Sequence, residues 1–206
     1  MLTLFRSDTG LLYADLDVNN QGMPQEYDNL TKPASAPDVN GGVLWPDTVN
    51  KLFYLYGGEY QSSPQSFSMW VYDAIYDKWN ATNPDVTQAN IQRASYGSGA
   101  TAQDRAVGFW YGGWLSNASV PTWGASPVAL ANLLEYDMLQ NTWTNSSGPD
   151  SVGRAEGAMV YIPASDGGML VYFGGLQTPF SNGTAIAQPM DVRVNLLKLP
   201  SRTNVI

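Results

Sequence analysis

Apolar and aromatic residues fall into short runs along the chain, and three of these runs end in a pair of glycines. The first reads KLFYLYGG at 51–58, and the pattern returns as FWYGG at 109–113 and LVYFGG at 170–175. Short apolar runs that are bounded by glycine and lack helical spacing predict buried β-strands. Because the Gly pairs recur at intervals of 55 and then 62 residues, the chain contains an internal repeat.

A second pattern follows the first two Gly pairs. WVYDAIYDKW at 70–79 and LEYDMLQNTW at 134–143 both carry a Tyr-Asp pair and, six residues beyond the Asp, a Trp. Two Gly-containing stretches that open with Arg, RASYGSGA at 93–100 and RAEGAMVY at 154–161, precede the second and third Gly pairs. Each unit is therefore expected to hold four short strands within about 60 residues, which is typical of a four-stranded antiparallel blade.

This ordered set of features resembles the kelch repeat, which builds β-propellers. The resemblance covers nearly the whole chain. The sequence pattern as a whole is similar to that of fungal secreted or membrane-anchored kelch proteins. The resemblance implies that the Gly pairs end the second strand of each blade and that the Trp residues pack between blades. The implied repeat positions are Gly57, Gly58, Tyr72, Asp73, Trp79, Gly112, Gly113, Tyr136, Asp137, Trp143, Gly174 and Gly175.

We therefore predict an all-β fold, a kelch-type β-propeller fragment of about three to four four-stranded antiparallel blades. The chain is expected to form one incomplete propeller domain with a divergent C-terminus, in which Ser201 takes the place of the expected Trp. The predicted parts of this 1–206 domain are a remnant blade at 1–35, blades at 37–82 and 91–146, and a partial blade at 152–206.

An incomplete propeller leaves its end blades uncovered. Propellers close with about four to eight blades, because closure protects strand edges and buries the face of each blade on its neighbour. An open end is expected to expose on the order of several hundred Å² of apolar surface, which is large for a monomer. We expect the chain to be a fragment of a longer product or, alternatively, to self-associate through its exposed blade faces.

The charge of the chain limits its partners. Charged residues make up 14% of the sequence, and the net charge is −8. An acidic surface repels phosphate groups, so nucleic acid is not an expected partner and acidic membrane surfaces are disfavoured. No apolar stretch approaches the roughly 18 residues of a membrane span. The opening MLTLF is interrupted by Arg6 and Asp8, so no signal peptide is expected.

The chain contains neither His nor Cys. This composition excludes disulfides, the usual zinc and haem ligands, thiol nucleophiles and imidazole bases within these residues. We predict no metal site, no cofactor and no enzymatic activity for these residues. The alternative is a fragment of a secreted galactose-oxidase-like propeller enzyme. That resemblance implies His ligands to copper and a Tyr cross-linked to a Cys, which would lie outside this chain.

The predicted function is a non-enzymatic binding scaffold for a protein or a glycan. The long loop at 114–129 is the best candidate surface, with Trp114 and Trp123 as candidate ligand contacts, because long loops on a rigid scaffold commonly carry function. An apolar loop equally suits folding over a blade edge. Arg93 and Arg154 are candidate ligand contacts near a central channel, with pairing to Asp residues as the structural alternative.

Five Asn-x-Ser/Thr sites, against roughly two expected by chance, indicate a glycoprotein. They lie at Asn29, Asn80, Asn117, Asn145 and Asn182. We expect an extracellular or cell-surface location for the parent protein. The alternative is that these residues are ordinary turn formers in a cytoplasmic protein, since no signal peptide is present.

Overall fold

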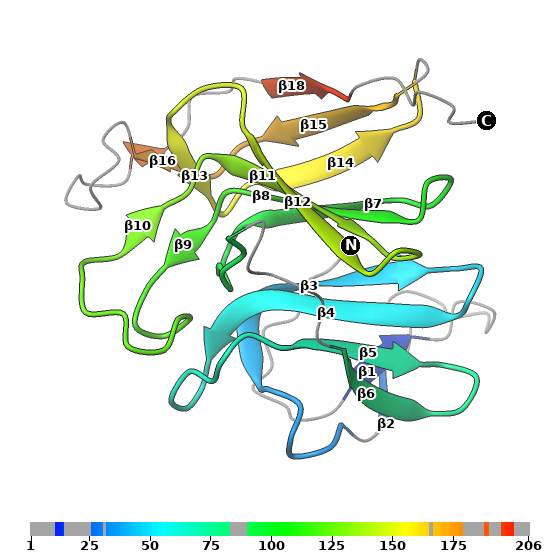
Figure 1. Cartoon of the computed structure of the whole chain (residues 1–206). Helices are drawn as coiled ribbons and strands as arrows, with labels where there is room; N and C mark the ends of the chain where they lie inside the picture. Colours follow the sequence, from blue (N-terminus) through cyan, green and yellow to red (C-terminus); the bar gives the residue numbers. More distant parts are fainter. Residues whose placement is uncertain are drawn as a thin grey trace.

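The computed structural model describes residues 11–14, 26–30, 32–82, 90–164, 167–178, 188–189 and 195–199, and it contains β-strands and no helix within these ranges. Blade 1 consists of β3 (Val39–Asp47), β4 (Leu52–Tyr60), β5 (Met69–Asp73) and β6 (Lys78–Thr82), paired in that order. Blade 2 consists of β7 (Ser98–Ala102), β8 (Val107–Tyr111), β11 (Asn132–Asp137) and β12 (Thr142–Ser147). Both are four-stranded antiparallel sheets (Figure 1).

Blade 3 contains three described strands, β14 (Ala158–Ile162), β15 (Met169–Phe173) and β18 (Asn195–Lys198). Two small sheets lie beside the blades: β9 (Trp114–Leu115) with β10 (Val128–Ala129), and β13 (Gly153–Ala155) with β16 (Leu176–Thr178) and β17 (Gln188–Pro189). The remaining pair is β1 (Leu11–Ala14) with β2 (Glu26–Leu30), within the predicted remnant blade.

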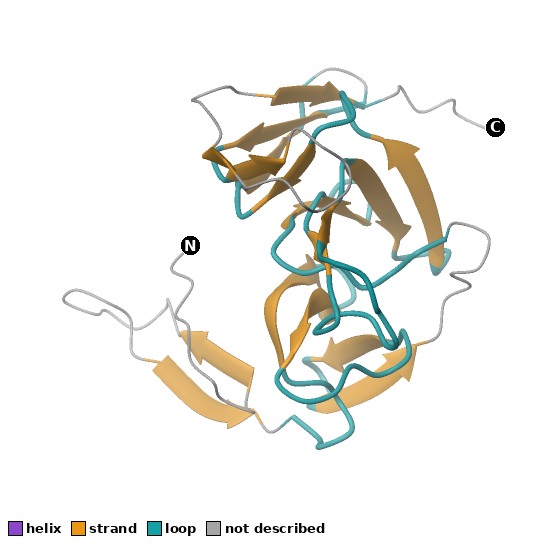
Figure 2. Cartoon of the chain, turned by 90° about the vertical axis from the view of Figure 1, so that its left-hand side faces the viewer, coloured by secondary structure: helices purple, strands orange, loops and turns teal. Residues whose placement is uncertain are grey.

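The three blades follow one another along an open arc (Figure 2). The predicted all-β architecture of a partial kelch-type propeller is thereby confirmed. We call the side of a blade that meets the next blade its front face, and the opposite side its rear face. Residue 201 of the predicted divergent C-terminus lies outside the described residues.

Trp45 fills the junction between blades 1 and 2. Its side chain on the front face of blade 1 has no exposed surface, and its ring stacks on Tyr56 at 5.3 Å and on Tyr136 of blade 2 at 6.1 Å. The indole N–H donates a 3.1 Å hydrogen bond to the carbonyl of Phe109. A Cβ atom at Gly108 would lie 2.4 Å from the Trp45 ring, so glycine on blade 2 makes room for the indole.

The junction between blades 2 and 3 has a core of its own. Phe109 and Tyr111 on the front face of blade 2 are fully buried against Met159, Leu170 and Tyr172 of blade 3. The rings of Tyr111 and Tyr172 meet edge to face at 5.1 Å, a favoured aromatic geometry. The two junctions therefore hold separate aromatic cores.

The Tyr-Asp motif closes the turn between the third and fourth strands. The Asp73 carboxylate accepts hydrogen bonds from the N–H groups of Ile75 and Tyr76, and the Tyr72 hydroxyl donates to Asp77 at 2.9 Å. Such Asx turns explain why Asp is the last residue of the strand. The same bonds recur in blade 2, with Asp137 accepting from Leu139 and Gln140 and Tyr136 donating to Asn141.

The first two Gly pairs join neighbouring blades. All six glycines of the three pairs have positive φ, between 67° and 96°, a region that glycine adopts without strain. The N–H of Gly58 donates to Ala94 at 2.8 Å, and the N–H of Gly113 donates to Arg154 at 2.7 Å. Each accepting carbonyl belongs to the segment that enters the next blade, so the pair ties consecutive blades together.

The two repeat Trp residues lie in different surroundings. Trp143 is buried in the core between blades 1 and 2, where its ring lies 5.0 Å from that of Tyr56. Trp79 is half-buried on the rear face of blade 1, with its ring 5.4 Å from that of Tyr72. The difference follows from position, because blade 1 covers the rear face of blade 2 and with it Trp143, whereas blade 1 is the first of the three blades.

We predict that Gly108→Ala destabilises the protein by about 1–3 kcal/mol, because overpacking a filled core forces its side chains apart. Urea denaturation measures the change in the free energy of unfolding. The control is Gly124→Ala, since a Cβ atom at Gly124 meets no atom within 4 Å, and it should change stability by less than about 0.5 kcal/mol. Equal stability of both variants would contradict the placement of Trp45.

Candidate functional site

The loop at 114–129 starts as the β9–β10 hairpin and folds over the Gly-Gly end of blade 1. Leu115 and Ser119 are buried, and the carbonyl of Ala118 accepts a 2.9 Å hydrogen bond from the N–H of Tyr60 at the end of β4. Val120 and Trp123 pack against the core between blades 1 and 2. The tip at 124–127 is exposed, so the loop combines a fixed base with an accessible end.

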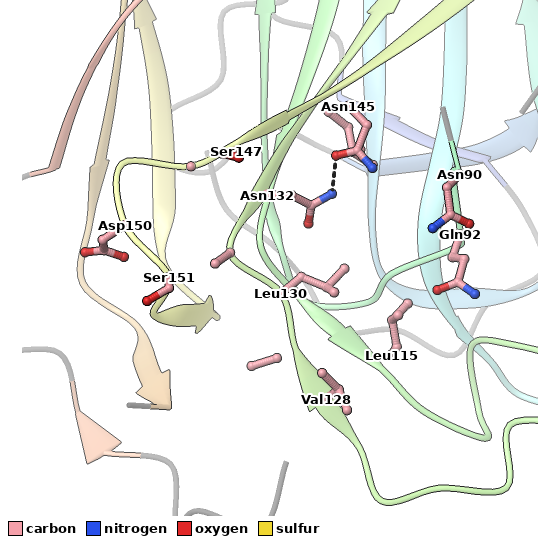
Figure 3. A pocket seen from close by; sticks show the side chains of 14 residues that line it. Asn90, Gln92, Leu115, Val128, Leu130, Asn132, Asn145, Ser147, Asp150 and Ser151 are labelled. Carbon is pink, nitrogen blue, oxygen red and sulfur yellow. Dashed lines mark hydrogen bonds between the residues drawn. The ribbon is translucent and has the colours of Figure 1, made fainter. Parts of the chain in front are cut away.

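A pocket of about 700 Å³ lies beside this hairpin (Figure 3). One part of its lining is apolar and comes from the hairpin and the segment that follows it, and the other part consists of side-chain amides, hydroxyl groups and one carboxylate. The apolar residues include Leu115, Val128, Leu130 and Leu134, and the polar residues are Asn90, Gln92, Asn132, Asn145, Ser147, Asp150 and Ser151.

The amides reach the pocket from distant parts of the chain. Asn90 and Gln92 belong to the segment that enters blade 2, Asn132 begins β11, and Asn145 lies on β12. The Asn132 amide donates a 2.8 Å hydrogen bond to the Asn145 side-chain oxygen (Figure 3). Each amide can both donate and accept hydrogen bonds, so this wall suits a ligand that offers both kinds of group.

Asp150 is the one ionisable residue among the described residues that line the pocket. Its carboxylate forms two bonds with the Arg154 guanidinium, at 2.6 and 2.7 Å. Hydrogen bonding by Arg154 holds the pKa of Asp150 below its ordinary value. Arg154 also donates to the Tyr111 hydroxyl at 3.0 Å, and burial raises the pKa of that tyrosine. Asp150 is therefore held as a paired carboxylate.

Arg93 is buried in a different network. Its guanidinium donates to the carbonyls of Gly57 at 2.6 Å and Ser68 at 2.7 Å, and it lies 5.1 Å from the centre of the Tyr60 ring. Arg93 and Arg154 are only 3% and 5% exposed. Both side chains tie blade segments together and neither lines the pocket. A direct contact of either with a ligand stays a prediction.

The two candidate Trp residues both belong to the hairpin loop. Trp114 is half-buried, and its backbone exchanges hydrogen bonds with Ser95 at 2.7 and 2.9 Å. Trp123 is half-buried, and its indole N–H donates to the Ser126 carbonyl at 3.2 Å. Neither lines the pocket, and their contact with a ligand also stays a prediction.

Sequence reasoning missed most of the pocket. Asn90, Gln92 and Asn132 belong to no recurring motif, and only Asn145 stood out, as part of an Asn-x-Ser/Thr site. The side chains of Asn80, Asn117 and Asn145 are exposed. Asn29 lies in β2, and residue 182 falls outside the described part of the chain.

The described residues contain no group of three or more Asp, Glu, His or Cys side chains placed to hold a metal ion. They also contain no helix with the length and apolar character to cross a membrane.

Comparison with known proteins supports the kelch assignment. No family model matches the chain. A stretch of 92 residues, or 44% of the chain, is 33% identical to Kelch-like protein 25 of Xenopus laevis. The matched stretch spans only 14% of the length of that protein. The similarity agrees with the repeat inferred from the Gly-Gly and Tyr-Asp patterns, whereas a relationship to fungal secreted or membrane-anchored kelch proteins stays a prediction.

We predict that Asp150→Asn destabilises the protein near neutral pH, because it removes the carboxylate that pairs with buried Arg154. The folded-state pKa of Asp150 is lowered, so its stabilisation is present above the unfolded pKa of about 3.9 and is lost as pH falls through the folded value. The difference in melting temperature between wild type and variant should therefore shrink between pH 6 and pH 3. A difference that is constant over this range would contradict the pairing.

Proposed function

We propose that the chain is a kelch-repeat binding scaffold that holds a protein partner at the Gly-Gly end of blades 1 and 2. The pocket beside the β9–β10 hairpin is the observation that carries this proposal. Its volume of about 700 Å³ lies in the usual range for ligand sites, and its walls come from fixed strands and a hairpin with a bonded base. A preformed surface of this kind limits the entropy lost on binding.

The lining favours an extended peptide segment of the partner. Asn90, Gln92 and Asn132 offer donors and acceptors that match the alternating N–H and C=O groups of a peptide backbone. Leu115 and Val128 supply aliphatic surface for the apolar side chains of such a segment. A glycan would satisfy the amides but would leave this aliphatic surface without an apolar partner.

We propose further that the chain acts without catalysis. General acid–base catalysis needs a group with a pKa near the working pH, whereas Asp150 is paired with Arg154 and its pKa is lowered. The sequence has no imidazole and no thiol. These residues therefore favour the scaffold over the galactose-oxidase-like alternative.

An extracellular or cell-surface location is part of the proposal. Its support is the exposure of Asn80, Asn117 and Asn145, since glycan transfer requires an accessible Asn in an Asn-x-Ser/Thr site. A cytoplasmic location is the alternative. Self-association through an exposed blade face is also proposed.

We predict that peptides selected from a displayed random library bind the purified 206-residue chain through the pocket. Gln92→Ala and Asn132→Ala should each weaken binding about 5- to 10-fold, since each removes about 1–1.5 kcal/mol of hydrogen bonding. Isothermal titration calorimetry with a selected peptide measures the loss. Asn117→Ala is the matched control, because it removes an exposed amide outside the pocket.

Melting curves of all three variants should match wild type, so that a weaker interaction reports the site. A selected peptide that binds the Gln92→Ala, Asn132→Ala double variant with unchanged affinity would overturn the pocket as the binding site. Binding of a glycan array, with no peptide enriched and with loss on Gln92→Ala, would favour a glycan partner.

We predict glycosylation at Asn80 and Asn117 when the chain is secreted from a eukaryotic host behind an added leader peptide. Asn145 should be less occupied, because its side-chain oxygen already accepts a hydrogen bond from Asn132. Mass spectrometry after enzymatic deglycosylation counts the occupied sites. Full secretion with every described site unmodified would argue against a glycoprotein.

A further inference from the structure

The front face of blade 3 is exposed, although the same face is covered in blades 1 and 2. Val160 and Phe173 are each 44% exposed and Ile162 is 41% exposed. Strand register places these three side chains on one side of the β14–β15 pair, with Phe173 opposite Ala158 and Val160 opposite Val171. We call this surface, formed by Ala158, Val160, Ile162, Val171 and Phe173, the open face.

When the three blades are aligned in sequence on their Gly pairs, the exposed residues of the open face correspond to buried residues in blades 1 and 2. Phe173 precedes its Gly pair as Tyr56 and Tyr111 precede theirs, yet both tyrosines have no exposed surface. Val160 pairs with Val171, two residues before Phe173, and Trp45 pairs with Tyr54, two residues before Tyr56. Val160 therefore corresponds to Trp45, which is fully buried. Blade 3 therefore presents the surface that receives the following blade in two established junctions.

The backbone shows the same interruption. Gly58 and Gly113 donate to carbonyls of the next blade, whereas Gly175, at the matching position, has no such acceptor among the described residues. A second series runs from the N–H of Tyr96 to the carbonyl of Gly41, at 2.8 Å, and from the N–H of Glu156 to the carbonyl of Tyr96, at 2.7 Å. The Glu156 carbonyl, next in this series, receives no donor within the described ranges.

We infer that the rear face of blade 1 in a second copy of this chain covers the open face. Side-chain size at the two established junctions supports this occupant. Trp45 on one front face meets Gly99 and Gly108, whereas Ala100, the residue that matches Trp45, packs in one cluster with Met159 and Leu170. A large front residue thus faces small rear residues, and a small front residue faces large ones.

Blade 1 has rear residues that can fill the space left where the open face carries a residue smaller than Trp. Val160, of intermediate size, takes the place of Trp45 on the open face. The rear positions of blade 1 that match Gly99 and Gly108 are Leu44 and Phe53. Leu44 is 40% exposed and Phe53 is half-buried, so both have surface left to bury.

Two such contacts close a ring. The three blades form an arc that is open on one side, and the β1–β2 pair lies beyond the rear side of blade 1 on this arc (Figure 2) without extensive contact with β3–β6. In the inferred ring the second copy takes the place of this pair, and two copies joined head to tail supply about six blades, within the roughly four to eight that propellers use. Because the front face of each copy meets the rear face of the other, both contacts are identical and no further copy can add. Closure of this kind avoids the open-ended filament that head-to-tail contacts otherwise produce.

Sedimentation velocity of the purified 206-residue chain tests the inference. The expected species has twice the 22.4 kDa chain mass. Phe173→Asp and Val160→Lys should each weaken the association at least 100-fold, with circular dichroism spectra unchanged. Leu139→Asp is the matched control, because Leu139 is an apolar residue that is 67% exposed on the β11–β12 turn of blade 2, which takes no part in the contact, and this variant should remain dimeric.

Mixing distinguishes a head-to-tail ring from other dimers. Phe173→Asp and Leu44→Asp should each yield monomers alone, whereas an equimolar mixture should recover a dimer through its one intact contact. A wild-type chain that stays monomeric at all concentrations would overturn the inference. So would Leu44→Asp that stays dimeric, since two open faces would then meet each other. This inference rests on the self-association proposed above and not on the pocket. Gln92 and Asn132 line the pocket and lie outside this interface, so failure here leaves the proposed peptide-binding pocket intact.

Discussion

The packing of a front face on the next rear face is the constraint on which this structure depends. A four-stranded sheet has two sides, and each side of an inner blade must be covered by a neighbour. Trp45 shows how specific this packing is, because the indole enters blade 2 only where Gly99 and Gly108 lack side chains. A repeat in which every unit carried the same residues could not alternate large and small in this way. The divergence between units is thus part of the fold.

The recurring motif serves two separate physical needs. The Asp73 and Asp137 carboxylates and the tyrosine hydroxyls close turns within a blade, whereas the first two Gly pairs bond to the next blade. Tyr136 does both, since its ring stacks on Trp45 and its hydroxyl donates to Asn141. Burial raises its pKa far above its ordinary value, so the hydroxyl keeps its proton and remains a donor at any physiological pH.

The sequence predicted the features that repeat, and it missed those that do not. Strand order and turn chemistry were accessible from the Gly pairs and the Tyr-Asp pairs, because each has a local conformational cause. Arg93 and Arg154 look equivalent in sequence, but the second unit has one more residue between its Arg and the following Gly. The positive φ of Tyr96 and Glu156 marks the true alignment, and it places the two arginines in different networks.

The pocket could not be predicted from the sequence, for a different reason. Its amides come from the segment entering blade 2, from β11 and from β12, so only the paired strands bring them together. None of these side chains has a role in blade packing that a repeat could reveal. Single-sequence reasoning detects periodic constraint, and a site made of unconstrained residues leaves no periodic trace.

The position of the pocket follows from a loop whose length differs between the two repeats. The second and third strands are joined by residues 61–68 in blade 1 and by residues 112–131 in blade 2. The longer connection folds back on blade 1 through the bond between Tyr60 and Ala118, and its hairpin forms one wall of the pocket. Asn90 and Gln92, which enter blade 2 from blade 1, form another. A ligand held between these walls contacts the segments that join two blades, so its binding free energy adds to the stability of that junction. Partner binding and blade packing are therefore thermodynamically linked at this site.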